Sequence, residues 1–379
     1  MKEVKKFVYI ALVAGGMLGS FISCDYLDVS KELSENLTLE QVFNNPGYTK
    51  RWQANIYNCI PNYSEMGKEA TTGFTGIWNL MSGQVVANTT AVGTQMLTGF
   101  NSSNASFHRW ATLYKYIRQG FIFLDNAKDY MGSEQDVSYI SKKDMDRLKA
   151  ETKFLIAYSY FSLFELYGPV PLITEIEDPE NKTIDYPRAS VDEIVNYIDR
   201  LLQEVLDSNA LPETLFTESA SGSLDYEHNN DRYNLKEIVR PTKVTVLALR
   251  AKLWVYAASP LFNGGYGEAL QLTNKDGKHL FPDEDKTKWN TAKTHLETLF
   301  TFAEAKGHKL YYSKPGSNGL PDPNLSVYEL FQYYNDEILW ANGNNSYRIV
   351  GNDMERRTCP RGANGFCNIG LYNKYPAFG

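Results

Sequence analysis

The chain has 379 residues, 43% of them hydrophobic, which is enough apolar material for the core of one large domain or of two ordinary ones. Its formal net charge is −7 at pH 7. We predict no nucleic-acid partner, because binding to phosphates requires a basic surface and no run of Lys or Arg supplies one.

The first two dozen residues differ from the rest of the chain. Three lysines precede an apolar run over residues 7–21, and Cys24 follows almost at once. A positive head and a short apolar core predict a secretory signal peptide over residues 1–23, since the run is too short to span a bilayer comfortably. The cysteine directly after it predicts a lipoprotein in which acyl chains on Cys24 anchor residues 24–379, expected to be one domain, to a membrane. The alternative is an ordinary cleavage site with a free or bridged cysteine.

Three further cysteines, Cys59, Cys359 and Cys367, leave an odd number if Cys24 is acylated. Cys359 and Cys367 are close enough in sequence to close a short loop, although spacing alone does not establish a disulfide. No Cys-x-x-Cys pair is present, so a zinc site is not expected.

Apolar residues at helical spacing predict a first pair of helices. The first is expected over residues 110–124, where the predicted inward stripe consists of Trp110, Leu113, Tyr114, Ile117, Phe121 and Leu124. The second is expected to begin at a capping box of Ser141 and Asp144 and to end at Gly168-Pro169. This second helix is apolar on nearly all sides between Phe154 and Leu166, so we expect it at the centre of the fold.

The same logic predicts two further pairs. Ser190 and Glu193 form a capping box before one helix, and its partner is expected to begin with Pro241 as its first residue and to end before Pro260. Another helix is expected from Trp289, with these residues facing inward: Ala292, Leu296, Leu299, Phe300 and Ala303. Recurring helix-turn-helix units predict an all-α fold of stacked tetratricopeptide-like pairs.

Long irregular segments separate these helices. They cover residues 60–106, 207–240 and 308–365, and loops of this length tend to carry function. Within residues 270–281, Asp276-Gly277 predicts the turn of a small β-hairpin.

Several segments together resemble the SusD/RagB family of Bacteroidetes outer-membrane lipoproteins. In chain order they are residues 24–29 (CDYLDV), 150–161 (AETKFLIAYSYF), 166–173 (LYGPVPLI), 187–194 (PRASVDEI), and 240–244 (RPTKV) with 258–261 (ASPL). The match of several segments in the same order and spacing is more specific than any one of them.

The resemblance implies a SusD-like helical fold and a nutrient-binding function. Proteins of this family are lipid-anchored on the outer membrane, face the outside, and bind glycans or sometimes peptides for a SusC-like TonB-dependent transporter. Residues 368–375 resemble a segment that the family follows with further helices, whereas this chain stops at Gly379. We therefore expect a truncated member of the family.

No catalytic or cofactor site stands out, so we predict a binding protein and not an enzyme. Glu151 and Glu165 lie on the predicted central helix and are expected to be packed or solvated. No His-x-x-x-His pair is present. Residues 227–231 and 283–285 carry carboxylates that could hold a structural calcium ion, but neither segment has EF-hand spacing, so no metal or other cofactor is predicted. Two alternatives stay open: a surface glycoside hydrolase, and a structural adaptor for a transporter with a peptide ligand or none.

Sugar binding requires flat aromatic faces with amides and charges nearby. Aromatic residues in the long segments, with their polar neighbours, are the candidates: Trp78, Asn79, Tyr311, Trp340, Tyr347 and Arg348. For each, packing of the loop onto the helical body is the alternative. For Trp340, alternation with Ile338 also fits a half-buried strand.

Overall fold

The computed structural model describes residues 37–61, 109–176, 185–217, 232–332 and 334–342. This part of the chain is all-α, as expected, and contains no β-strand. Its helices are α2 (Leu39–Asn44), α3 (Pro46–Ile56), α6 (Trp110–Asn126), α7 (Lys142–Tyr167), α8 (Val191–Asp207), α10 (Lys243–Ala258), α11 (Lys288–Ala305) and α12 (Pro323–Leu330), with short 3-10 turns η2 (Tyr57–Cys59), η3 (Leu235–Glu237) and η4 (Ala269–Gln271). None of the described helices is long and apolar enough to cross a membrane.

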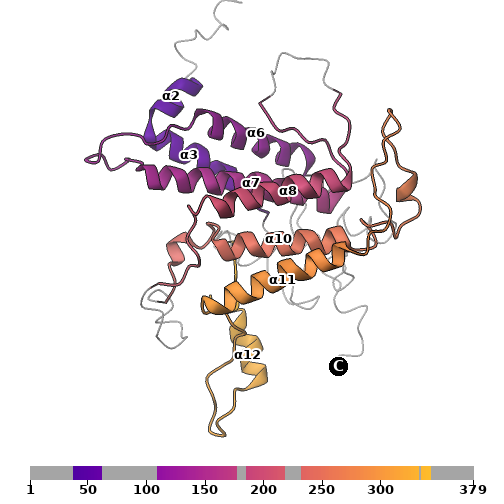
Figure 1. The fold of residues 1–379 in the computed structure, drawn as a ribbon. Helices are drawn as coiled ribbons and strands as arrows, with labels where there is room; N and C mark the ends of the chain where they lie inside the picture. Colours follow the sequence, from indigo (N-terminus) through magenta and orange to yellow (C-terminus); the bar gives the residue numbers. More distant parts are fainter. Residues whose placement is uncertain (1–36, 62–108, 177–184, 218–231, 333, 343–379) are drawn as a thin grey trace, which may run out of the picture.

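The helices stack in the order in which they occur along the chain. α6 packs on α7, α7 on α8, α8 on α10, and α10 on α11, so that successive antiparallel helices form layers (Figure 1). This arrangement matches the expected tetratricopeptide-like pairs, in which each unit covers the face that its neighbour leaves exposed.

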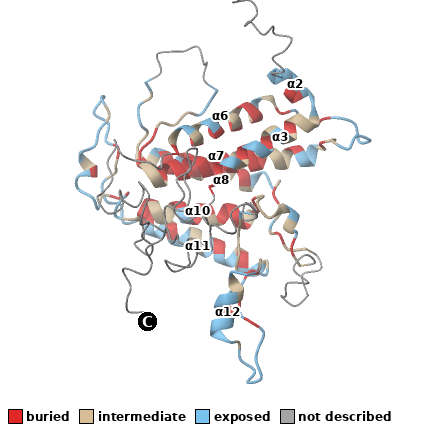
Figure 2. Cartoon of the chain, turned by 180° about the vertical axis from the view of Figure 1, so that it is seen from behind, coloured by how far each residue is buried: buried red, intermediate tan, exposed pale blue. Residues whose placement is uncertain are grey.

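Helix α7 is the centre of these layers, as its apolar composition predicted. Every residue from 154 to 164 is buried, and Figure 2 shows this helix buried along most of its length. Close packing on α6 depends on Gly120, because a Cβ atom there would lie 2.7 Å from Cγ1 of Ile156. The small residue therefore allows the two helices to approach.

The predicted helix ends are mostly confirmed. The side chains of Ser141 and Ser190 accept hydrogen bonds from the N–H groups of Asp144 and Glu193, and Gly168 ends α7 with φ 65°. Pro241 was predicted to be the first residue of its helix, and this prediction is wrong. Instead the side chain of Thr242 caps the helix, which begins at Lys243.

The face of α11 was predicted only in part. Ala292, Leu299 and Ala303 are buried, the last two with Val244, Leu247 and Ala251 of α10 in a second hydrophobic cluster. Phe300 was also predicted to face inward, but it is 59% exposed. The buried stripe of α11 is therefore narrower than the apolar pattern suggested, because α10 is the main described helix that packs on α11.

The predicted β-hairpin is reduced to a tight turn. Gly277 has φ 83°, as such a turn requires, but Thr273 and His279 form an isolated antiparallel bridge. Strand pairing goes no further because Ala269–Gln271 adopts a 3-10 turn. Helix α12, within the segment predicted as a long loop, was also missed.

A buried ion network joins the N-terminal helices to α7 and to the segment before α10. The carboxylate of Glu151, which is fully buried, accepts hydrogen bonds from Tyr57 Oη at 2.8 Å, Arg147 Nε at 2.9 Å and Arg240 Nε at 2.8 Å. Both arginines also pair with Glu237, at 2.6 and 2.7 Å. Burial raises the pKa of Tyr57 well above its usual value, so the phenol remains a donor. Two positive and two negative charges therefore neutralise one another inside the fold.

Glu151→Gln should lower the free energy of unfolding by about 3 kcal/mol, because it leaves two arginines facing a neutral amide. We place the loss at the lower end of the range for a buried pair because both arginines are partly exposed. Glu297→Gln is the matched control, since its carboxylate is exposed and lies 3.6 Å from Lys293. We expect the control to change stability by less than about 0.5 kcal/mol. Urea unfolding followed by circular dichroism measures both, and equal losses would contradict a special role for Glu151.

Candidate ligand-binding site

Trp340, one of the predicted sugar-binding residues, packs on the central helix. Its ring lies 5.4 Å from the rings of Phe154 and Tyr158, edge to face with both. Its indole N–H donates to the carbonyl oxygen of Val239 at 2.8 Å. The half-buried strand that was the alternative for Trp340 does not form in residues 334–342. The indole holds the segment of residues 334–342 against α7, and a role in ligand binding stays a prediction.

Tyr311 is also turned toward the protein. It is 8% exposed, its hydroxyl donates to Glu329 at 2.6 Å, and its backbone N–H donates to Glu337 at 2.9 Å. Its neighbour Tyr312 is 63% exposed and presents the freer aromatic face. The remaining predicted residues lie outside the described part of the chain: Cys24, Trp78, Asn79, Tyr347 and Arg348.

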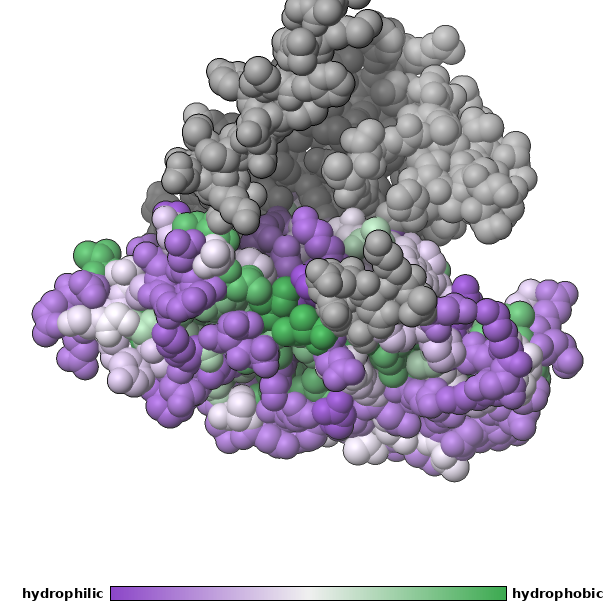
Figure 3. Space-filling model, turned by 90° about the horizontal axis from the view of Figure 1, so that it is seen from above, coloured by the Kyte–Doolittle hydropathy of each residue, from purple (hydrophilic) through white to green (hydrophobic). Residues whose placement is uncertain are grey.

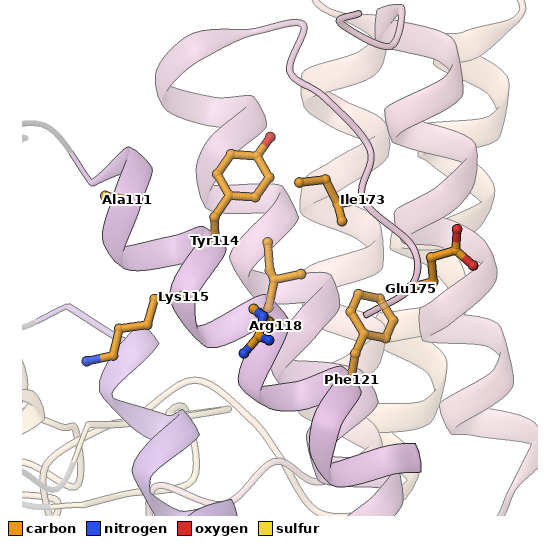
Figure 4. A pocket seen from close by; sticks show the side chains of 8 residues that line it. Ala111, Tyr114, Lys115, Arg118, Phe121, Ile173 and Glu175 are labelled. Atoms are coloured by element: carbon orange, nitrogen blue, oxygen red, sulfur yellow. The ribbon is translucent and has the colours of Figure 1, made fainter. Parts of the chain in front are cut away.

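A pocket of about 260 Å³ lies between α6 and the segment that follows α7 (Figure 4). It is lined by Ala111, Tyr114, Lys115, Ile117, Arg118, Phe121, Ile173 and Glu175. We call it the α6 pocket. Seen from above, the described surface is mostly hydrophilic, and hydrophobic side chains gather in a central band (Figure 3). The α6 pocket combines both characters, with apolar walls and a charged rim.

Two tyrosines fix the wall opposite α6. Gly168 turns the chain at the end of α7, and the segment after it returns along α6. The hydroxyl of Tyr160 donates to the carbonyl of Ile173 at 2.6 Å and accepts from its N–H at 2.9 Å. The hydroxyl of Tyr114 donates to the carbonyl of Pro171 at 2.7 Å. Burial raises the pKa of Tyr114 above its usual value, so this donor is retained at neutral pH.

The charged groups of the α6 pocket are available for a ligand. Arg118 and Glu175 are exposed, and among the described residues neither has an ion-pair or hydrogen-bond partner. Figure 4 shows Glu175 beside the ring of Phe121, and Tyr114 facing Ile173. Aromatic and aliphatic walls with a guanidinium and a carboxylate at the edge suit a ligand that has both apolar faces and hydroxyl groups.

The sequence pattern did not identify this pocket. Tyr114 and Phe121 were assigned to the buried stripe of the helix, but both are half-buried and shared between core and pocket. The one sequence feature that pointed to a pocket was Arg118, a charged residue three positions before Phe121 on the same helix. The opposite wall comes from residues more than 50 positions away, and no local pattern links them to α6.

A second depression of about 440 Å³ lies at the N-terminus of α8, and its polar groups are largely occupied. It is lined by Ser190, Asp192, Leu270, Gln271, His279, Phe281, Pro282 and Asp283. Asp192 pairs with Lys288 at 2.6 Å, and Nδ1 of His279 lies 3.0 Å from the carbonyl oxygen of Leu270. In the acidic segment next to it, Asp285 accepts two hydrogen bonds from Thr287. Among the residues that the structure describes, no group of three His, Cys, Asp or Glu side chains could hold a metal ion.

The two carboxylates singled out on the central helix are both engaged. Glu151 belongs to the buried network described above. Glu165 pairs with Lys252 at 3.2 Å and accepts a hydrogen bond from Tyr256 at 2.8 Å. Both therefore have the packed role that was expected of them.

The chain is similar to several solved structures. Among solved structures, BT4246 is 22% identical with a TM-score of 0.50, over 82% of this chain and 47% of that one. A SusD homolog from Bacteroides thetaiotaomicron VPI-5482 is 19% identical with a TM-score of 0.47, over 78% and 48%. A laminarin-binding SusD-like protein is 18% identical with a TM-score of 0.39, over 58% and 42%. The chain thus spans about half the length of these proteins, and no curated protein matches it.

The sequence also matches a family over more than half of its length. Residues 25–223 match the SusD-like family described as starch-binding and associating with the outer membrane. The family expected from the sequence segments and the expected all-α fold are both confirmed. The chain belongs to the SusD-like family.

Proposed function

We propose that this protein binds a glycan at the bacterial surface, without altering it chemically, and delivers it to a SusC-like TonB-dependent transporter. The observation that carries the proposal is the match of residues 25–223 to a family described as starch-binding and associating with the outer membrane. A lipid anchor on Cys24 would hold the protein at that membrane.

The α6 pocket supports a glycan as the ligand. A sugar ring has apolar faces that pack on aromatic side chains, here Tyr114 and Phe121. Its hydroxyl groups donate to carboxylates and accept from guanidinium groups, and Glu175 and Arg118 supply one of each. We therefore propose this pocket as a contact for one unit of a longer chain.

The arrangement of carboxylates supports binding without hydrolysis. Glycoside hydrolysis in most families uses two carboxyl groups on opposite sides of the scissile bond. Among the described residues that line the α6 pocket, Glu175 is the one carboxylate, and Glu151 and Glu165 are held in ion pairs elsewhere.

Arg118→Ala and Glu175→Gln should each weaken glycan binding about tenfold, as expected for the loss of one hydrogen bond to a charged group. Isothermal titration calorimetry with soluble starch fragments and a panel of other oligosaccharides measures the affinity. Arg51→Ala is the matched control, because Arg51 is exposed on α3 and does not line the pocket. Glycan binding that is unchanged in both pocket variants would exclude the α6 pocket as the contact.

Cys24→Ser should abolish incorporation of labelled palmitate and move the protein from the membrane fraction to the soluble fraction, because the thiol that would carry the acyl chains is gone. Cys59→Ala is the control, since Cys59 is a buried free thiol and should not affect labelling. Equal labelling of the Cys24→Ser variant and the parent protein would contradict the anchor.

A further inference from the structure

The segment of residues 310–332, which we call the arm, projects from the helical layers. It follows α11, carries α12, and extends away from the other helices (Figure 1). Figure 2 shows α12 largely exposed. Seven large hydrophobic side chains of the arm are exposed: Leu310, Tyr312, Leu320, Leu325, Val327, Tyr328 and Phe331. The last of these is 81% exposed. Water-exposed apolar groups gathered in one segment mark a surface that another surface covers.

The arm is folded, with its polar side chains on the inside. Asp322 caps α12 by accepting from the N–H groups of Asn324 and Leu325. The hydroxyl of Ser326 accepts from the N–H of Ser313 at 2.9 Å, and Glu329 accepts from Tyr311. Ser326 is the one buried residue of α12. Helix α12 therefore buries a serine and exposes Leu325, Val327 and Tyr328. In an ordinary surface helix the apolar side chains face the core and the polar ones face water.

We infer that the apolar face of the arm is a docking surface for the chain's own residues 343–379. Residue 343 comes eleven positions after the end of the arm at residue 332, so this segment is within reach of the arm. It holds ten large apolar side chains that can cover the arm: Tyr347, Ile349, Val350, Met354, Phe366, Ile369, Leu371, Tyr372, Tyr375 and Phe378.

Charge favours the same pairing. Residues 343–379 contain four Arg and one Lys against one Asp and one Glu, a net charge of +3 in a chain whose total is −7. The arm has the opposite sign, with Lys314 against Asp322 and Glu329. Long-range attraction therefore favours contact of the basic segment with the acidic remainder of the chain, and the exposed apolar side chains of the arm supply the place where it docks. This inference does not depend on the proposed glycan-binding function.

Photo-cross-linking in the full chain tests the inference. Tyr328→p-benzoylphenylalanine places the probe on the exposed face of α12, and Tyr266→p-benzoylphenylalanine is the control, because Tyr266 is a similarly exposed tyrosine outside the arm. After irradiation, cross-linked peptides are identified by mass spectrometry, and the mass of the product distinguishes one chain from two. We expect the probe at position 328, and not the probe at 266, to cross-link within one chain to residues 343–379.

Other occupants of the arm give different products. A cross-link between two chains would show that a second copy covers the arm and would overturn the inference. A probe at position 328 that reacts with solvent or lipid and not with residues 343–379 would overturn it as well. Phe331→Ser alongside the probe provides a second reading, since loss of an apolar contact should reduce the yield of the expected product, and an undiminished yield would contradict an apolar docking surface.

Discussion

The arrangement of the helical layers depends on the hydrogen bonds and ion pairs of the buried Glu151 carboxylate. Glu151 lies on the central helix and holds Tyr57 from the N-terminal part and Arg240 from the segment that leads into α10. Each partner lies about 90 positions from Glu151 in the sequence, Tyr57 before it and Arg240 after it. A charge with so many partners tolerates few alternative arrangements, because any other packing leaves part of the network buried and unpaired.

The α6 pocket follows from the same central helix. The chain leaves the buried half of α7 at Gly168 and then runs along α6. Tyr160, from within α7, reaches that segment and binds both backbone groups of Ile173. The wall of the pocket is therefore held by the core, while Arg118 and Glu175 at its edge are left for a ligand. Apolar walls with charged groups at the rim suit recognition of a molecule that has both apolar faces and hydroxyl groups.

Much of the fold could be predicted from the sequence, because helical periodicity and capping residues act locally. Ser190 with Glu193 and the glycine at position 168 marked true helix ends. The start at Pro241 was wrong by two residues because a threonine that follows it is a better cap. Helix α12 was missed because its apolar side chains point outward, although Asp322 before Pro323 was a usable start signal. The α6 pocket could not be predicted, since its two walls meet only through tertiary packing.

Capture of an intact glycan by this SusD-like chain can be tested by native affinity gel electrophoresis in a panel of polysaccharides that includes starch. An assay for new reducing ends is run on the same mixtures. We expect that at least one polysaccharide retards the protein and that no reducing ends are released. Release of reducing ends, or unretarded migration in every polysaccharide, would contradict it.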